Sequence, residues 1–92
     1  MKIFYVSQDI NNDYDVYSDF VIICKDEEQA RTTHPMDINL KWQNGNWRRN
    51  PCDSNFYDSL TWVKPSDVKV TYLGEAADGI EESIICSSFH AG

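Results

Sequence analysis

Residues 20–35 read FVIICKDEEQARTTHP, an apolar run followed by a polar, acidic stretch that ends at a proline. The apolar run, residues 20–24, is typical of a deeply buried strand. Asp26 is placed to cap a helix, because two glutamates follow it in the first turn, where the helix dipole favours negative charge. The residue before a proline avoids helical geometry, so we expect the helix to run from about residue 27 to 33 and to end before Pro35.

Strand patterns flank this unit on both sides. Residues 3–8 alternate, with aromatic and β-branched side chains on both faces, which indicates a central strand. Residues 38–49 predict a hairpin around Asn44-Gly45, a preferred pair for a tight turn. Two further strands are expected over residues 68–73 and 80–89, the last centred on Ile84 to Cys86. We expect loops over residues 9–19, 50–60 and 74–79, an extended piece over 61–63 and a turn over 65–67.

These elements predict an α+β fold, a small, mostly antiparallel β-sheet with one short α-helix packed on it. The chain has 92 residues, so we expect a single domain over residues 1–92. No apolar run approaches the roughly 18 residues of a membrane-spanning helix, and the opening residues show no signal-peptide pattern. Three cysteines without close spacing indicate a reducing compartment. We therefore expect a cytoplasmic protein with no membrane partner.

Charge is unevenly distributed along the chain, which has a net charge of −7. Residues 1–40 carry three basic and eight acidic side chains, residues 41–69 carry five and three, and residues 70–92 carry none and four. A negative surface repels nucleic-acid phosphates, which require clustered Lys and Arg. It attracts a basic patch on another protein instead. The composition thus predicts a partner with a basic surface and no nucleic-acid partner.

An Asp- and Asn-rich segment over residues 9–19 is the first candidate site. Its alternating oxygen side chains resemble the start of a calcium-binding loop, but Tyr14 stands where that loop needs glycine and Phe20 where it needs glutamate. Two interpretations remain open: a solvated connection built from Asx turns, or a recognition loop with tyrosine anchors and complementary carboxylates. The residues that we expect to bind a partner in the second case are Asp9, Asp13, Tyr14, Asp15, Tyr17 and Asp19.

The cysteines and histidines do not define a metal or catalytic site. Cys24, Cys52, Cys86, His34 and His90 form no C-x-x-C or H-x-x-x-H pair, the spacings that are typical of zinc sites. Cys24 and Cys86 lie in apolar runs, where cysteine usually behaves as a small hydrophobe, so we expect a structural role for both. No nucleophile–base pair or phosphate-binding loop is defined by the sequence. We expect no metal, no cofactor and no enzyme activity.

A second candidate site is the chain's one cluster of basic and aromatic residues, Trp42, Trp47, Arg48 and Arg49. Its tryptophans either cover the sheet or a dimer partner, or they stack on a small anionic ligand such as a nucleotide while arginines contact its phosphate. The second case describes a homo-oligomeric sponge that sequesters a signalling nucleotide without turning it over. Its ligand-binding residues would be His34, Trp42, Trp47, Arg48 and Arg49.

Two stretches carry a resemblance: SQDINNDYDVYSDFVIICKDEEQARTTHP, residues 7–35, and VKVTYLGEAADGIEESIICSSFHAG, residues 68–92. In these stretches the chain resembles a group of short proteins encoded by bacteriophages and prophages. Residues 36–58 have no counterpart in that group, and His90 stands where the group has asparagine. The resemblance brings no functional residue with it. It implies a phage setting, in which small acidic proteins often block host defences.

The first functional hypothesis is therefore a small acidic phage-encoded accessory protein. We expect it to bind and inhibit a host protein with a basic surface, a component of an antiviral defence system, through the acidic and aromatic segment described above. The alternative hypothesis is the homo-oligomeric nucleotide sponge. The two differ in the chemistry of the partner, since one predicts a protein and the other a small anion.

Overall fold

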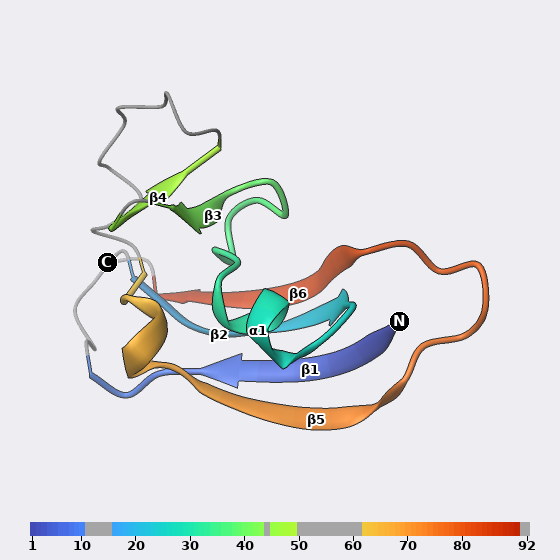
Figure 1. Ribbon diagram of the computed structural model, residues 1–92. Helices are drawn as coiled ribbons and strands as arrows, with labels where there is room; N and C mark the ends of the chain where they lie inside the picture. Colours follow the sequence, from blue (N-terminus) through green and yellow to red (C-terminus); the bar gives the residue numbers. More distant parts are fainter. Residues whose placement is uncertain (11–15, 44, 50–61, 91–92) are drawn as a thin grey trace.

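The computed structural model describes residues 1–10, 16–43, 45–49 and 62–90. It confirms a small α+β globule in which a mostly antiparallel sheet carries one short helix (Figure 1). The sheet has four strands in the order β5-β1-β2-β6, and each pair of neighbours is antiparallel. In chain order the elements are β1 (Lys2–Ser7), β2 (Val16–Cys24), α1 (Glu27–Arg31), β3 (Lys41–Gln43), β4 (Asn46–Arg48), the 3-10 turn η2 (Pro65–Asp67), β5 (Lys69–Glu75) and β6 (Ser83–His90).

Strand β1 lies inside the sheet, between β5 and β2, as its two apolar faces predicted. Phe4 pairs with Ile22 and Val6 pairs with Phe20. Since paired residues in a sheet point to the same face, these four side chains form one apolar surface. All four are buried.

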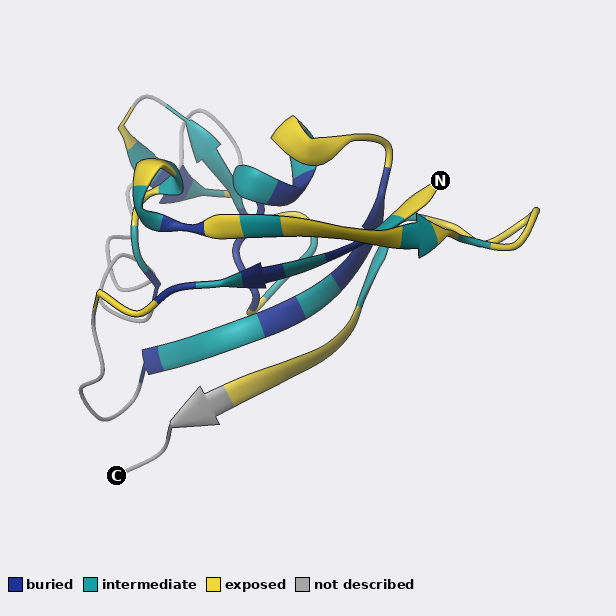
Figure 2. Cartoon of the chain, turned by 90° about the horizontal axis from the view of Figure 1, so that it is seen from below, coloured by how far each residue is buried: buried dark blue, intermediate teal, exposed yellow. Residues whose placement is uncertain are grey.

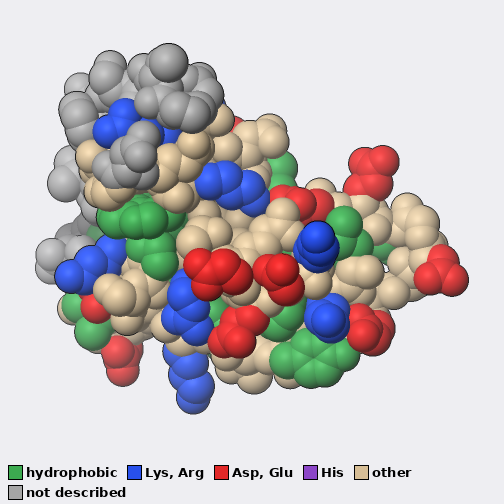
Figure 3. Space-filling view, viewed as in Figure 1, with side chains coloured by type: hydrophobic (Ala, Val, Ile, Leu, Met, Phe, Trp, Pro, Cys, Tyr) green, Lys and Arg blue, Asp and Glu red, His purple; other side chains and the backbone are tan. Residues whose placement is uncertain are grey.

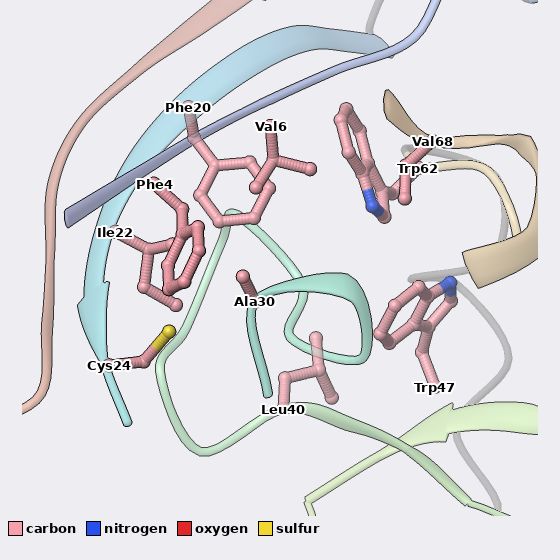
Figure 4. Close-up of a cluster of buried hydrophobic side chains, with 10 residues drawn as sticks. All are labelled: Phe4, Val6, Phe20, Ile22, Cys24, Ala30, Leu40, Trp47, Trp62 and Val68. Atoms are coloured by element: carbon pink, nitrogen blue, oxygen red, sulfur yellow. The ribbon is translucent and has the colours of Figure 1, made fainter. Parts of the chain in front are cut away.

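The cover of this apolar surface comes from three separate segments. Ala30 of α1, Leu40 before β3 and Trp47 of β4 face the sheet side chains in Figure 4, and each is at most 1% exposed. Trp62 closes the end of the core, where its ring lies edge-on to Phe20 at 5.5 Å between ring centroids. The core therefore lies between the sheet on one side and the helix and hairpin on the other.

Helix α1 begins as predicted and ends two residues early. The Oδ1 atom of Asp26 accepts a hydrogen bond from the backbone N–H of Gln29 at 2.9 Å, which confirms the N-cap. At the other end, the hydroxyls of Thr32 and Thr33 donate to the backbone carbonyls of Glu28 and Gln29 at 2.8 and 2.7 Å. These side chains satisfy the terminal carbonyls, and Thr33 already bridges to the next strand.

A predicted strand and the predicted hairpin have different boundaries in the structure. Strand β2 begins at Val16, four residues before the predicted start, because pairing with β6 extends over the polar residues of its first half. The hairpin is shorter than predicted, because Asp37 holds residues 38–40 in a turn: its Oδ1 accepts from Asn39 N–H and its carbonyl from Leu40 N–H, both at 2.9 Å. Gly45 has a φ of +79°, which suits the predicted tight turn. The predicted loop over 50–60 lies outside the described residues.

Strand β6 lies at an edge of the sheet, and its residues 85–88 are exposed. Cys86 pairs with Val21, whose neighbours Phe20 and Ile22 are buried on the helix-covered face, so Cys86 lies on the opposite side of the sheet. The register shifts at this point, since Ile22 pairs with Ile84, and Ile85 is 55% exposed. Figure 2 shows the exposed residues of β5 and β6 along the strands. The predicted strand is therefore present, and Ile85 and Cys86 at its centre are exposed.

Candidate functional site: an acidic hollow

A hollow of about 590 Å³ opens where the chain leaves β1. The ends of β1 and β5, the first half of β2 and the turn η2 line it. Three carboxylates belong to its wall, those of Asp9, Asp19 and Asp67, and we call this feature the acidic hollow. Lys69 is the one basic side chain among the described lining residues. The wall is therefore negatively charged on balance.

Asp19 is held in the wall by a tyrosine from the neighbouring strand. Asp19 pairs with Ser7, so its side chain lies on the same face as that of Tyr5. The Tyr5 hydroxyl donates a hydrogen bond to Oδ2 of Asp19 at 2.9 Å. This hydrogen bond raises the pKa of Tyr5 above its ordinary value, and burial and the negative charge of Asp19 raise it further, because a phenolate would lie beside a carboxylate.

Gln8 fixes the segment that carries Asp9. Its Nε2 donates to the carbonyl of Tyr17 at 3.1 Å, and its Oε1 accepts from the backbone N–H of Ile10 at 2.8 Å. Its own backbone N–H donates to the carbonyl of Ser18 at 3.2 Å. Because Gln8 is buried, these bonds are shielded from water. Asp9, next in the chain, is left exposed at the rim of the acidic hollow.

The carboxylates of the acidic hollow take no part in the three ion pairs found among the described residues. Those pairs are Arg31–Glu27 at 3.1 Å, Lys41–Glu82 at 2.9 Å and Arg49–Asp37 at 3.2 Å. The basic side chains of these pairs therefore lie outside the acidic hollow. On the face that carries α1, acidic and basic side chains are interspersed (Figure 3). The charge of that face is mixed, whereas the hollow carries three acids against one base.

The structure brings two of the six predicted partner-binding residues together, Asp9 and Asp19. Asp19 does so from a strand, not from the predicted loop. Tyr17 is also in β2, half-buried, and its ring lies edge-on to that of His34 at 6.0 Å. Asp13, Tyr14 and Asp15 lie outside the described residues. Asp67 was missed by the sequence reasoning, because only the pairing of β5 with β1 brings η2 beside this end of the sheet.

The predicted ligand-binding residues also come together, but largely as part of the interior. His34 and Trp47 are 0% and 1% exposed, and their rings lie edge-on at 5.3 Å. Nδ1 of His34 accepts a hydrogen bond from Met36 N–H at 3.0 Å. Trp42 packs on Trp47 at 5.1 Å, and Arg49 pairs with Asp37. A nucleotide could stack on His34 only if the hairpin moved away, so no observation favours the sponge.

The two described cysteines differ in environment. Cys24 is buried as predicted, its Sγ donates to the carbonyl of Asp26 at 3.3 Å, and burial raises its pKa to about 11. Cys86 is exposed, although its apolar run predicted that it behaves as a small hydrophobe. Across the described ranges, no three His, Cys, Asp or Glu side chains are placed to hold a metal ion. Helix α1 is far too short to cross a membrane, and no other described helix is long and apolar enough.

The fold and the hollow together define a small acidic α+β protein with a negatively charged concave surface at one end of its sheet. Comparisons with protein-family models, with curated proteins and with solved structures find no match to this chain.

Proposed function

We propose that the protein acts by contact, binding a partner protein that inserts a basic side chain into the acidic hollow. The partner that we propose is a host protein of an antiviral defence system, inhibited by this binding in the host cytoplasm. The phage setting implied by the sequence resemblance is the basis for that choice of partner. No catalytic step is part of the proposal.

The observation that carries the proposal is the convergence of Asp9, Asp19 and Asp67 on one hollow. They come from three separate parts of the chain, so the fold itself concentrates the charge. Like charges brought together raise the free energy of the unbound protein, and a Lys or Arg side chain of a partner relieves that repulsion. The net charge of −7 adds long-range attraction, which speeds encounter with a basic surface.

A charge-reversal experiment tests this proposal. The immobilised protein is used to capture partners from a bacterial host lysate, which are identified by mass spectrometry, and the affinity for the captured protein is then measured by calorimetry. The variant Asp9→Lys with Asp67→Lys is expected to weaken binding at least tenfold. Wild-type binding is expected to weaken as salt rises, because salt screens exposed charges.

A matched control separates the acidic hollow from net charge alone. Asp78→Lys with Glu81→Lys changes the net charge by the same amount at exposed positions between β5 and β6. This control should keep most of the affinity, and both variants should keep the melting temperature of the wild type within a few degrees. Unchanged binding by the Asp9, Asp67 variant, or equal loss in both variants, would show that the hollow is not the binding site.

A further inference from the structure

The two outer strands of the sheet, β5 and β6, differ in how their outer edges are protected (Figure 1). An outer strand presents main-chain N–H and C=O groups to which another chain can pair, and proteins commonly guard such an edge with charged side chains. Strand β5 carries Lys69 and Glu75 at its two ends, and both are exposed. Strand β6, with the sequence SIICSSFH, contains no Asp, Glu, Lys or Arg. Charge therefore guards the edge of β5 and not that of β6.

The middle of β6 is exposed on both of its faces. Within the described part of the chain, β2 is the one strand that pairs with β6. Residues 85–88 are all exposed, as Figure 2 shows along this strand. Successive side chains of a strand point to opposite faces of the sheet, so a run of four exposed residues is not limited to one face. The side of β6 that faces away from β2 is therefore accessible to a second strand.

A groove of about 510 Å³ lies between β6 and the turn that follows α1. The turn contributes residues 35–38 and the strand contributes residues 83–87. The pairing of β6 with β2 skips Ile85, which forms a bulge, and a bulge re-aims a side chain. Ile85 is 55% exposed and lines the groove together with Met36, which is 44% exposed. The groove thus offers apolar contacts beside the outer strand.

The charges around this groove are neutralised within the chain. Asp37, the one charged residue among its described lining, pairs with Arg49 at 3.2 Å. Glu82, which precedes β6, pairs with Lys41 at 2.9 Å. Elsewhere the net charge of −7 makes two copies of the chain repel one another. The edge of β6 is a surface on which two copies meet without that repulsion, whereas a basic partner gains no attraction from it.

We propose that two copies of this chain pair through β6 as antiparallel neighbours and form a dimer with one continuous sheet. With the pair centred near Ile85, the two Ile85 side chains pack together, and each contacts Met36 of the other copy in the groove. Because both copies use the same strand, the contact is two-fold symmetric and closes after two chains. The charges on β5 oppose further growth at the other edge of the sheet.

This dimer goes beyond the proposed function and leaves the acidic hollow accessible. None of the described residues that line the hollow belongs to β6. Pairing through β6 therefore covers none of these residues directly, and the dimer presents two acidic hollows. Two hollows in one particle increase the avidity for a partner that itself offers two basic side chains.

The oligomeric state of the full chain, measured by analytical ultracentrifugation over a range of concentrations, tests this inference. The wild type should form dimers as its concentration rises. Ile85→Lys places a charge on the edge of β6 and should raise the dissociation constant of the dimer at least tenfold. Leu73→Lys is the matched control, because Leu73 is the residue skipped in the pairing of β5 with β1 and is 56% exposed. It should dimerise as the wild type does.

Both variants change the net charge equally, so a difference between them reports the position of the charge. In dilute solution both should keep the melting temperature of the wild type within a few degrees. A wild type that stays monomeric at all concentrations would overturn the inference. Equal dimerisation by Ile85→Lys and Leu73→Lys would do the same.

A chemical cross-link shows which surface the two copies share. Cys86 is exposed and Cys24 is buried, so in a Cys52→Ser background a short bismaleimide reacts at Cys86. Pairing centred near Ile85 sets the two Cys86 residues diagonally across the strands, about 7–8 Å apart, a distance that the reagent spans. Cross-linked dimers should form in this background and be lost when Ile85→Lys is added. Dimers that give no Cys86 cross-link would place the contact elsewhere and contradict the inference.

Salt distinguishes the dimer from the proposed function. Screening weakens the repulsion between two acidic copies, so added salt should strengthen the dimer while it weakens binding of a basic partner at the acidic hollow. Asp9→Lys with Asp67→Lys should still dimerise, and Ile85→Lys should still bind the partner in the hollow. A dimer that weakens as salt rises would contradict pairing through an uncharged edge. Loss of partner binding in a variant that still dimerises concerns the hollow alone.

Discussion

The hydroxyl of Tyr5 and the carboxylate of Asp19 are joined by a 2.9 Å hydrogen bond that connects β1 to β2 at the acidic hollow. The bond gives Asp19 a fixed position, since Tyr5 belongs to β1, one of the two inner strands of the sheet. A carboxylate accepts several hydrogen bonds, so this contact leaves Asp19 able to accept another from a partner. Tyr5 is in this way a positioning residue for the hollow.

Replacing Tyr5→Phe should lower the free energy of unfolding by about 0.5–1.5 kcal/mol at pH 7, the usual net value of one hydrogen bond. The effect also depends on pH. The pKa of Tyr5 is raised above 10.0 in the folded state, so the folded protein holds its proton more tightly than the unfolded chain. That stabilisation is present below pH 10 and is lost as pH rises through the folded-state pKa.

Urea denaturation between pH 8 and pH 11 measures this dependence. The wild type should lose stability more steeply above pH 10 than Tyr5→Phe does, whereas Tyr72, whose pKa is also raised, titrates in both proteins and cancels from the difference. Asp19→Asn should bring the ionisation of Tyr5, followed by NMR, back toward pH 10. Parallel curves for wild type and Tyr5→Phe would contradict the role of the bond.

The described cysteines should react at very different rates. At pH 8 a thiol with a pKa of about 11 is about 0.1% ionised, so Cys24 combines burial with a low thiolate fraction. Cys86 is exposed on β6. In a Cys52→Ser background, iodoacetamide should label Cys86 within minutes and leave Cys24 unlabelled until urea unfolds the chain. Mass spectrometry of tryptic peptides measures both, and rapid native labelling of Cys24 would show that its site opens readily.

How far the sequence predicts this fold depends on the range of the interactions involved. Asp26 caps its helix through a neighbour three residues away, and the positive φ of Gly45 between β3 and β4 is equally local, so both could be predicted. The exposure of Cys86 could not, since it depends on β6 taking an edge position beside β2. A continuous apolar run is typical of a strand covered on both faces, and the run from Ile84 to Cys86 departs from that rule because Ile85 and Cys86 are exposed on an edge strand.

In the candidate site, too, local features could be predicted from the sequence and features that depend on long-range strand pairing could not. Acidic side chains near Asp9 could be expected to matter from their density along the chain. The contribution of Asp67 depends on strand pairing between distant segments, which periodicity does not reveal. Trp47 and Trp62 also join one core cluster through long-range contacts, and within the described residues neither indole N–H has a hydrogen-bond partner.

The cap of α1 gives a prediction about the stability of the core. Asp26→Ala removes the 2.9 Å bond to Gln29 N–H and should lower the free energy of unfolding by about 1 kcal/mol. Asp26→Asn keeps an acceptor at the same position and should restore most of that loss. Thermal and urea denaturation measure both variants. An equally large loss in Asp26→Asn would assign the effect to the negative charge instead of the hydrogen bond.

Lys41 and Glu82 tie the hairpin to the segment before β6, and their coupling can be measured. Nζ of Lys41 lies 2.9 Å from Oε1 of Glu82 and 2.8 Å from the hydroxyl of Thr33, and Gln29 donates to the other oxygen of Glu82. The side chains of Lys41 and Glu82 are only 28% and 27% exposed, so solvent screens the pair less than an ordinary surface ion pair.

A double-mutant cycle with Lys41→Met and Glu82→Gln should therefore give a coupling of about 1 kcal/mol in the free energy of unfolding, falling moderately in 1 M salt. Arg31 and Glu27 supply the comparison within the same protein. Their pair is spaced i,i+4 on the helix and the Glu27 side chain is 61% exposed, so its cycle should give about 0.3–0.5 kcal/mol and vanish in salt. Equal coupling for the two pairs would mean that partial burial adds nothing here, and that packing alone holds the hairpin on the sheet.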